Sequence, residues 1–201
     1  MKIFELSGNV RTALSKAAVK SLRNHDEIPC VLYGNGVENV HFSVSNRDVK
    51  GLIYTPSSFI VSILIGDKNH LAVLQEIQFH PVTDQVLHLD FLAADESSPV
   101  TIQIPVALDG VSEGVKAGGK LMITTRKLNV KGLIKDLPDS LSIDITGLKL
   151  GKSIMASELH YPNIQIMTPK NTIVCSVKTT RAAMGAIAAA AAAAASASKK
   201  K

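Results

Sequence analysis

Residues 59–78, FIVSILIGDKNHLAVLQEIQ, decide the fold class. The run at 59–65 is apolar almost throughout and rich in β-branched residues, which predicts a strand buried on both faces. Residues 66–69, Gly-Asp-Lys-Asn, form a turn sequence. Residues 70–78 then return as the partner strand of a hairpin. The first half of the chain is therefore expected to be β-rich.

Working outward from this hairpin, alternating apolar residues at 3–6, 40–44 and 86–91 predict further strands. Residues 30–33, Cys-Val-Leu-Tyr, read as a short strand that ends at Gly34. Ser45 and Asn46 are suited to cap a short helix at 47–53, closed by Thr55-Pro56. Six short strands with one or two short helices predict a closed or half-closed six-stranded barrel over residues 1–94.

A second β-rich domain is expected at 95–180, after the polar, proline-terminated segment 93–99. Residues 100–106 alternate, and Pro105 favours an edge strand. A glycine-rich loop at 110–120 precedes a long strand pattern at 121–133, and strands are also expected at 140–145 and 172–177. Residues 181–201 form an Ala/Ser-rich low-complexity tail that ends in three lysines. The predicted fold class is mainly β with a few short helices.

Composition favours a polyanionic partner only weakly. The formal net charge is +5, but residues 1–94 hold 8 Lys and Arg against 9 Asp and Glu, so much of the excess lies further along the chain. Cys30 and Cys175 are far apart in strand-like runs, which indicates buried reduced thiols rather than a disulfide or metal site. With no apolar signal region and no apolar run long enough for a membrane span, the protein is expected to be cytoplasmic.

The most basic local stretch is residues 9–36, with four cations before the first acid, Asp26. Lys16, Lys20 and Arg23 are spaced i, i+4, i+7 and so share one face of a helical segment, and Arg11 precedes them. This pattern predicts a polyanion site beside the strand at 30–33. A solvated helix face beside an ordinary edge strand explains the same residues.

Known catalytic motifs give no support for an enzyme. Residues 114–120 match the G-x-x-x-x-G-K core of a phosphate loop, but Leu121 replaces the Ser/Thr that would hold magnesium. A strand-like segment follows where a phosphate loop needs a helix, so a glycine loop between strands is the better interpretation. The sequence has no catalytic triad spacing, nucleophile elbow, paired-acid site or dinucleotide fingerprint. No cofactor is expected.

His80, His88 and Asp90 are the remaining polar candidates. His88 and Asp90 are two residues apart, so on a strand they project from the same face. Two histidines and a carboxylate could hold a metal. The same residues could instead read a nucleic-acid groove, with the carboxylate accepting from a guanine amino group and the imidazole donating to sugar or phosphate. They could also be ordinary, partly exposed polar residues of a strand.

Several segments together resemble a known family, that of ribosomal protein twenty-five of the bacterial large subunit. In the first half these are VRTALSKAAVKSLR…IPCVLYGNG, the return at 75–81 (QEIQFHP) and HLDF at 88–91. The second half, IPVALDGVSEGVKAGGKLM…LPDSLSIDITGLKLGKSI, resembles the extra domain of the long form, the CTC or general stress type. The similarity covers about residues 3–178.

The resemblance implies a structural ribosomal protein whose first domain is a β-barrel that binds 5S rRNA on the minor-groove side of its internal loop E. By position it implies the following RNA contacts: Arg11, Lys16, Lys20, Arg23, Tyr33, Gln75, His80, His88 and Asp90. Two positions depart from the family pattern. Ser21 stands where many members carry a second consecutive basic residue, and Phe79 where an arginine or other polar residue is frequent.

The resulting hypothesis is a non-enzymatic component of the large ribosomal subunit, with 5S rRNA and other subunit components as partners and neither membrane nor small-molecule substrate. The alternatives are a protein-interaction or stress module, and a metal-dependent enzyme that uses His80, His88 and Asp90.

Overall fold

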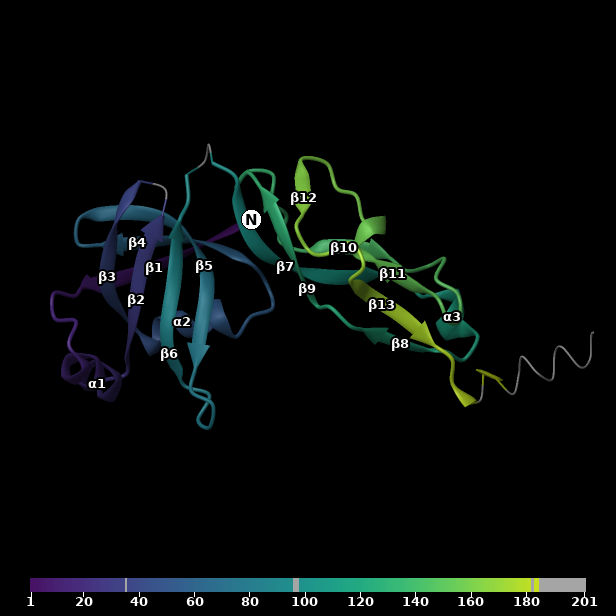
Figure 1. Ribbon diagram of the computed structural model, residues 1–201, viewed down its shortest axis with the longest axis horizontal. Coiled ribbons are helices and arrows are strands. Elements are labelled where there is room, and N and C mark those ends of the chain that lie inside the picture. The colour runs from purple at the N-terminus through teal and green to yellow at the C-terminus, as the bar shows by residue number, and fades with distance from the viewer. Residues whose placement is uncertain (35, 96–97, 182, 185–201) are drawn as a thin grey trace, which may run out of the picture. The chain divides into compact units, whose positions relative to one another are not determined.

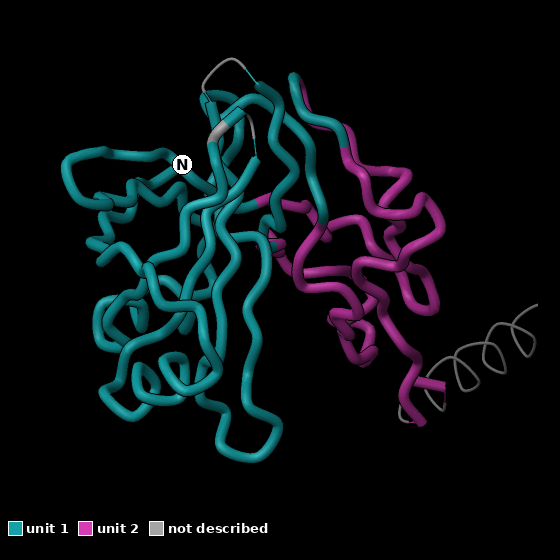
Figure 2. Tube along the Cα trace, turned by 60° about the vertical axis from the view of Figure 1, so that its left-hand side comes forward, with its two compact units in different colours: residues 1–105, 129–140, 163–165 teal, residues 106–128, 141–162, 166–201 magenta. Residues whose placement is uncertain are grey.

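The computed structural model describes residues 1–34, 36–95, 98–181 and 183–184 (Figure 1). The chain divides into two compact units (Figure 2). Unit 1 contains residues 1–105, 129–140 and 163–165, and unit 2 contains residues 106–128, 141–162 and 166–201. The expected domain boundaries after residues 94 and 180 stay predictions.

Six strands of unit 1 form a closed barrel, as predicted, in the order β1-β3-β2-β6-β5-β4. The strands are β1 (Lys2–Val10), β2 (Glu27–Gly34), β3 (Val37–Ser45), β4 (Phe59–Ile65), β5 (Lys68–Phe79) and β6 (Val86–Ala93). Two helices interrupt them: α1 (Lys16–Asn24) follows β1, and α2 (Asn46–Ile53) follows β3. Most neighbouring strands are antiparallel, but β1 pairs with β4 and β2 pairs with β6 in parallel.

Alternate residues of each strand fill the barrel interior. On β6, Leu89 and Phe91 are fully buried, and the Phe91 ring lies 5.8 Å from the ring of Phe42 between centroids. The prediction that residues 59–65 are buried on both faces is wrong, because Leu64 is 50% exposed. The strand is part of a barrel wall, so one of its faces lies in the core and the other meets solvent.

Both helices of unit 1 begin at serine caps. The Ser45 Oγ accepts a hydrogen bond from the Arg47 backbone N–H at 3.4 Å, which confirms the predicted start of α2. The Ser15 Oγ accepts from the Ala18 N–H at 3.3 Å and starts α1. A basic helix therefore forms where the spacing of Lys16, Lys20 and Arg23 predicted one.

The second half of the chain is also β-dominated. A four-stranded sheet has the order β10-β7-β9-β12, and a three-stranded sheet has the order β11-β13-β8. Its elements are β7 (Val100–Asp109), α3 (Glu113–Lys116), β8 (Lys120–Ile123), β9 (Lys127–Gly132), β10 (Leu141–Asp144), β11 (Ser153–Met155), a 3-10 turn (Ala156–Glu158), β12 (Ile164–Ile166) and β13 (Ile173–Lys178).

Three expectations for this half need correction. The long strand at 121–133 is two strands, because the chain turns where the N–H groups of Thr124 and Thr125 both donate to the carbonyl of Val174. Residues 110–120 contain the short helix α3 rather than a plain loop. The strand that holds Pro105 is internal, not an edge. Its pairing with β10 begins only at Val106, so the proline stands just outside that ladder.

Cys30 and Cys175 are buried free thiols, as predicted. Burial raises the pKa of both thiols, so each stays a neutral, unreactive group. Among the described residues, no helix is long and apolar enough to cross a membrane. The Ala/Ser-rich tail lies almost entirely outside the described residues.

Candidate nucleic-acid interface

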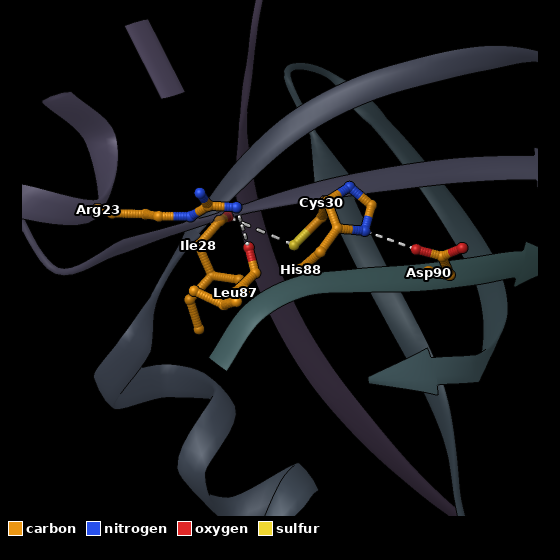
Figure 3. Close-up of polar contacts among 6 residues, drawn as sticks. All are labelled: Arg23, Ile28, Cys30, Leu87, His88 and Asp90. Carbon is orange, nitrogen blue, oxygen red and sulfur yellow. Dashed lines mark hydrogen bonds and ion pairs between the residues drawn. The ribbon is translucent and has the colours of Figure 1, made fainter. Parts of the chain in front are cut away.

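The outer face of β6 carries the central polar pair of the candidate interface. Leu89 and Phe91 point into the barrel, so His88 and Asp90 project outward between the neighbouring strands β2 and β5. The His88 Nδ1 lies 2.6 Å from the Asp90 Oδ1 (Figure 3). Their side chains are 28% and 24% exposed, so the pair is accessible but held in place.

This hydrogen bond determines which donor and acceptor atoms of His88 and Asp90 remain free for a ligand. When Nδ1–H donates to the carboxylate, the neutral imidazole keeps its lone pair at Nε2. His88 Nε2 and the Asp90 carboxylate then both act as acceptors on one strand face. Acceptors of this kind suit the amino group of guanine and the ribose 2′-hydroxyl, which are the donors displayed in the minor groove of RNA.

Strand register adds two polar residues that sequence reasoning missed. Glu76 on β5 lies opposite Asp90, and Gln78 lies opposite His88. Both are exposed, whereas Gln75, the residue inferred from the family pattern, falls at an irregularity between Leu74 and Glu76 and has no paired residue on β6. The alternation of residues 74–78 alone could not reveal Glu76 and Gln78 as the facing pair, because a bulge shifts the register by one residue.

Tyr33, on β2, is held close to the same acidic side chains. Burial, followed by the negative charges of Asp90 and Glu76, raises the pKa of the Tyr33 phenol above its usual value. The phenol therefore stays protonated at neutral pH and can donate a hydrogen bond beside two acceptors. Tyr33, Glu76, His88 and Asp90 together form a mixed donor and acceptor surface on adjacent strands.

The raised pKa of Tyr33 predicts a loss of stability at alkaline pH. The unfolded chain releases this proton near pH 10, while the folded protein retains it to higher pH, so folding becomes less favourable as pH rises above about 10. We expect the alkaline decline in unfolding free energy to be smaller in Tyr33→Phe than in the wild type. Urea unfolding at pH 8 and pH 10.5 measures it. An identical decline in both proteins would contradict the environment described for Tyr33.

His80 has a local structural role that the sequence did not indicate. It lies after β5, where its backbone N–H donates to the Gln85 carbonyl at 2.8 Å. Its Nδ1 accepts from the backbone N–H groups of Val82 and Thr83, at 3.3 and 3.2 Å. His80 therefore shapes the loop between β5 and β6, and only its Nε2 edge is left to meet a ligand.

The basic helix α1 is joined to β6 through Arg23. The Arg23 Nη2 donates to the carbonyl of Leu87 at 2.9 Å, one residue before His88 (Figure 3). Lys16 and Lys20 are exposed on the same helix. The structure thus brings the basic segment and the polar strand residues to one region of the barrel. One of the five donors of the Arg23 guanidinium is used for this attachment.

Arg11 lies between β1 and α1 and is only partly exposed. Its backbone N–H donates to the His41 carbonyl at 2.9 Å. Its Nε is buried and has no hydrogen-bond partner among the described residues. Arg11 lines a groove of about 450 Å³ together with residues of α1 that include Ala18, Ser21 and Leu22. Ser21, one of the two departures from the family pattern, therefore lies at the groove.

Phe79, the other departure, is 44% exposed at the end of β5 and is not a core residue. The alternative of a metal centre has no geometric support in the part of the chain that the structure describes, where no three potential ligands of the His, Cys, Asp or Glu type converge. Within that part, His88 and Asp90 form a pair with each other, and His80 is engaged in its own loop.

Comparison with known proteins identifies both halves of the chain. The model of the ribosomal L25p family matches residues 6–91, and that of the ribosomal protein TL5 C-terminal domain matches residues 99–181. Three similar proteins, all named large ribosomal subunit protein bL25, come from Porphyromonas gingivalis, Azobacteroides pseudotrichonymphae and Bacteroides fragilis. The first is 49% identical over 187 residues, covering 92% of this chain and 97% of the relative.

The second is 47% identical over 188 residues, covering 94% of this chain and all of the relative. The third is 45% identical over 193 residues, covering 94% and 98%. None of these names denotes an enzyme. With both family models matched and near-complete coverage of these relatives, the chain belongs to the L25p family of ribosomal proteins, in the long form that carries a TL5-type C-terminal domain.

Proposed function

We propose that this protein is a structural component of the large ribosomal subunit and that it binds 5S rRNA through the outer face of its barrel. The observation that carries the proposal is the His88–Asp90 pair, held at 2.6 Å on the central strand of a polar face and reached from the side by the basic helix α1. The family resemblance implies that this face binds the minor-groove side of loop E.

The two parts of the interface have different roles in this proposal. Lys16, Lys20 and Arg11 contact phosphates and position the barrel, which gives affinity without sequence information. Asp90, His88 and Tyr33 meet base edges and ribose hydroxyls, which gives selectivity for the groove shape. Arg23 contributes partly by holding α1 against β6.

Electrostatic attraction provides only a modest share of the binding in this account. If about four cations each displace a counterion, the logarithm of the binding constant falls with the logarithm of salt concentration with a slope of roughly −3. Residues 1–94 hold more acids than bases, so long-range attraction is weak and the hydrogen bonds of the strand face must supply the selectivity.

Replacing Arg11 with alanine tests the positioning role. Arg11 lines the groove beside α1, where the remaining N–H groups of its guanidinium would meet a phosphate oxygen. We expect Arg11→Ala to weaken binding to loop E RNA and to a plain duplex alike, and to reduce the magnitude of the salt slope by about one. Filter binding over a series of salt concentrations measures both quantities.

Arg47→Ala is the matched control, because Arg47 is an exposed arginine on α2 and lies outside the proposed interface. It should leave affinity and slope nearly unchanged. If Arg11→Ala behaved like Arg47→Ala, Arg11 would not contact RNA. A loss confined to loop E RNA would instead assign Arg11 to groove readout.

A further inference from the structure

The positive charge of this chain is concentrated in unit 2 rather than in the unit that carries the barrel. Unit 1 contains ten Lys and Arg against thirteen Asp and Glu, a formal charge of −3. Residues 106–184 of unit 2 contain nine Lys and Arg against four Asp and Glu, a formal charge of +5. The proposed 5S rRNA interface uses none of this charge, so unit 2 has an unassigned basic surface.

Six exposed basic side chains lie on segments near the start of β8 and the end of β13. The ribbon shows α3 beside these two strand ends (Figure 1). The two strands are antiparallel, and Lys120 on β8 is directly opposite Lys178 on β13. Like charges at directly opposite positions destabilise a sheet. We call the set the basic end; it consists of Lys116, Lys120, Lys149, Lys152, Lys178 and Arg181.

Two glycines allow these segments to approach one another. A Cβ on Gly114 would lie 2.8 Å from the carbonyl carbon of Lys149, and a Cβ on Gly119 would lie 2.6 Å from Val177 Cγ1. Any larger residue at either position would push the segments apart. The Gly-x-x-x-x-Gly-Lys stretch, which is not a phosphate loop, thus has a packing role that brings α3, β8 and the Lys149 segment together.

Hydrogen bonds hold the remaining members in place. The Val177 N–H donates to the carbonyl of Lys152 at 3.0 Å, so the Lys152 segment runs beside the end of β13. The Thr180 Oγ1 donates to the Gly118 carbonyl at 2.6 Å, which brings Arg181 beside the turn that precedes Lys120. The backbone segments that carry the basic end are therefore held together by the fold of unit 2.

Within the described residues, none of the six side chains of the basic end forms an ion pair. Glu113, three residues before Lys116 on α3, is the nearest acid in sequence. Two of the four acids of unit 2, Asp109 and Asp144, lie opposite each other on β7 and β10, and the Asp144 carboxylate accepts from Thr146. The six cations of the basic end repel one another, and this repulsion is relieved when a polyanion binds.

The chemistry of the set indicates which polyanion. Five of the six residues are lysines, which contact phosphate as point charges and lack the planar fork of arginine. The chain has no Phe, Tyr or Trp between Phe91 and Tyr161, and the Tyr161 hydroxyl donates to the Ser142 carbonyl. None of the six residues of the basic end is aromatic, so the set suits a nucleic-acid backbone better than unpaired bases.

We propose that the basic end contacts the phosphate backbone of ribosomal RNA at a second site, separate from the one held by the barrel. This inference rests on the proposed place of the protein in the large subunit, but not on the loop E contact. The basic end then adds affinity without sequence preference, and the barrel decides where the protein binds.

The double variant Lys120→Gln/Lys178→Gln tests this proposal, with Lys127→Gln/Lys170→Gln as the matched control. Both remove two positive charges from exposed positions of unit 2, but only the first pair lies in the basic end. Binding of the full-length proteins is measured to large-subunit particles from which the protein has been removed, and separately to a 5S rRNA fragment that contains loop E.

We expect the first double variant to lower affinity for the particles by roughly 10- to 100-fold at 0.1 M salt and to reduce the magnitude of the salt slope by up to about two. The control should bind the particles like the wild type, and both variants should bind the 5S fragment like the wild type. Hydroxyl-radical footprinting on the particles should lose a set of rRNA backbone protections outside loop E in the first variant only.

Equal binding of the two double variants to the particles would overturn the second site while leaving the barrel's function intact. A fall in affinity without any change in the rRNA footprint would also overturn it, because the partner would then be an acidic protein surface. Failure of the wild type to bind the 5S fragment would instead overturn the loop E proposal. Comparing the two double variants for binding to the particles would still test the proposal for the basic end.

Discussion

Replacing Phe91 with alanine is expected to lower the unfolding free energy of unit 1 by about 3–5 kcal/mol, the range found when a buried phenylalanine is truncated. Phe91 is fully buried on the central strand of the proposed interface and packs against the Phe42 ring. Natural domains have only about 5–15 kcal/mol of stability, so this loss is a large fraction of the total. The cost arises from lost burial and from the cavity that remains.

Phe79→Ala is the control, because it removes the same side chain from an exposed position at the end of β5. Its cost should stay within about 0.5 kcal/mol. Urea unfolding followed by circular dichroism gives the midpoints, and hydrogen exchange of the β6 amides confirms that the change lies in unit 1. Similar losses in the two variants would contradict the barrel core described above.

Replacing Asp90 with asparagine is expected to reduce the preference for loop E RNA over a plain duplex by roughly 5- to 150-fold, equivalent to about 1–3 kcal/mol of base discrimination. The substitution exchanges a carboxylate oxygen for a donor N–H₂, which cannot accept from a guanine amino group. It also weakens the bond that orients His88. Removing a negative charge should leave binding to the duplex unchanged or slightly stronger.

Asp67→Asn is the matched control, since Asp67 is an exposed acid in the turn between β4 and β5. It makes the same change in charge and should leave the preference for loop E intact. Both variants should unfold at nearly the wild-type urea concentration. An unchanged ratio of loop E to duplex binding in Asp90→Asn would show that Asp90 does not read the groove.

The barrel could be predicted from sequence because its signals are local. Alternating apolar residues, a continuous apolar run at 59–65 and the flanking turn residues predicted the six strands, and the serine before α2 predicted where that helix begins. The prediction failed where tertiary context decides. Leu64 lies in an apolar run yet faces solvent, and Pro105 lies in an internal strand because the β10 ladder starts one residue later.

The candidate site was predictable in part for the same reason. His88 and Asp90 could be placed on one face because they are two residues apart on a single strand. Glu76 and Gln78 depend on the register between two strands, and a bulge at Gln75 sets that register. The role of His80 in its own loop depends on hydrogen bonds to backbone groups that no spacing rule predicts.

The central claim is that the polar face of β6 and its neighbours selects the shape of loop E. The most direct test measures binding of the wild-type protein to a 5S rRNA fragment that contains loop E and to a fully paired duplex of equal length, each at low and high salt. The account predicts that loop E binding persists at high salt while duplex binding is lost. Equal binding to both RNAs, declining together with salt, would contradict it and leave the barrel with only a nonspecific basic segment.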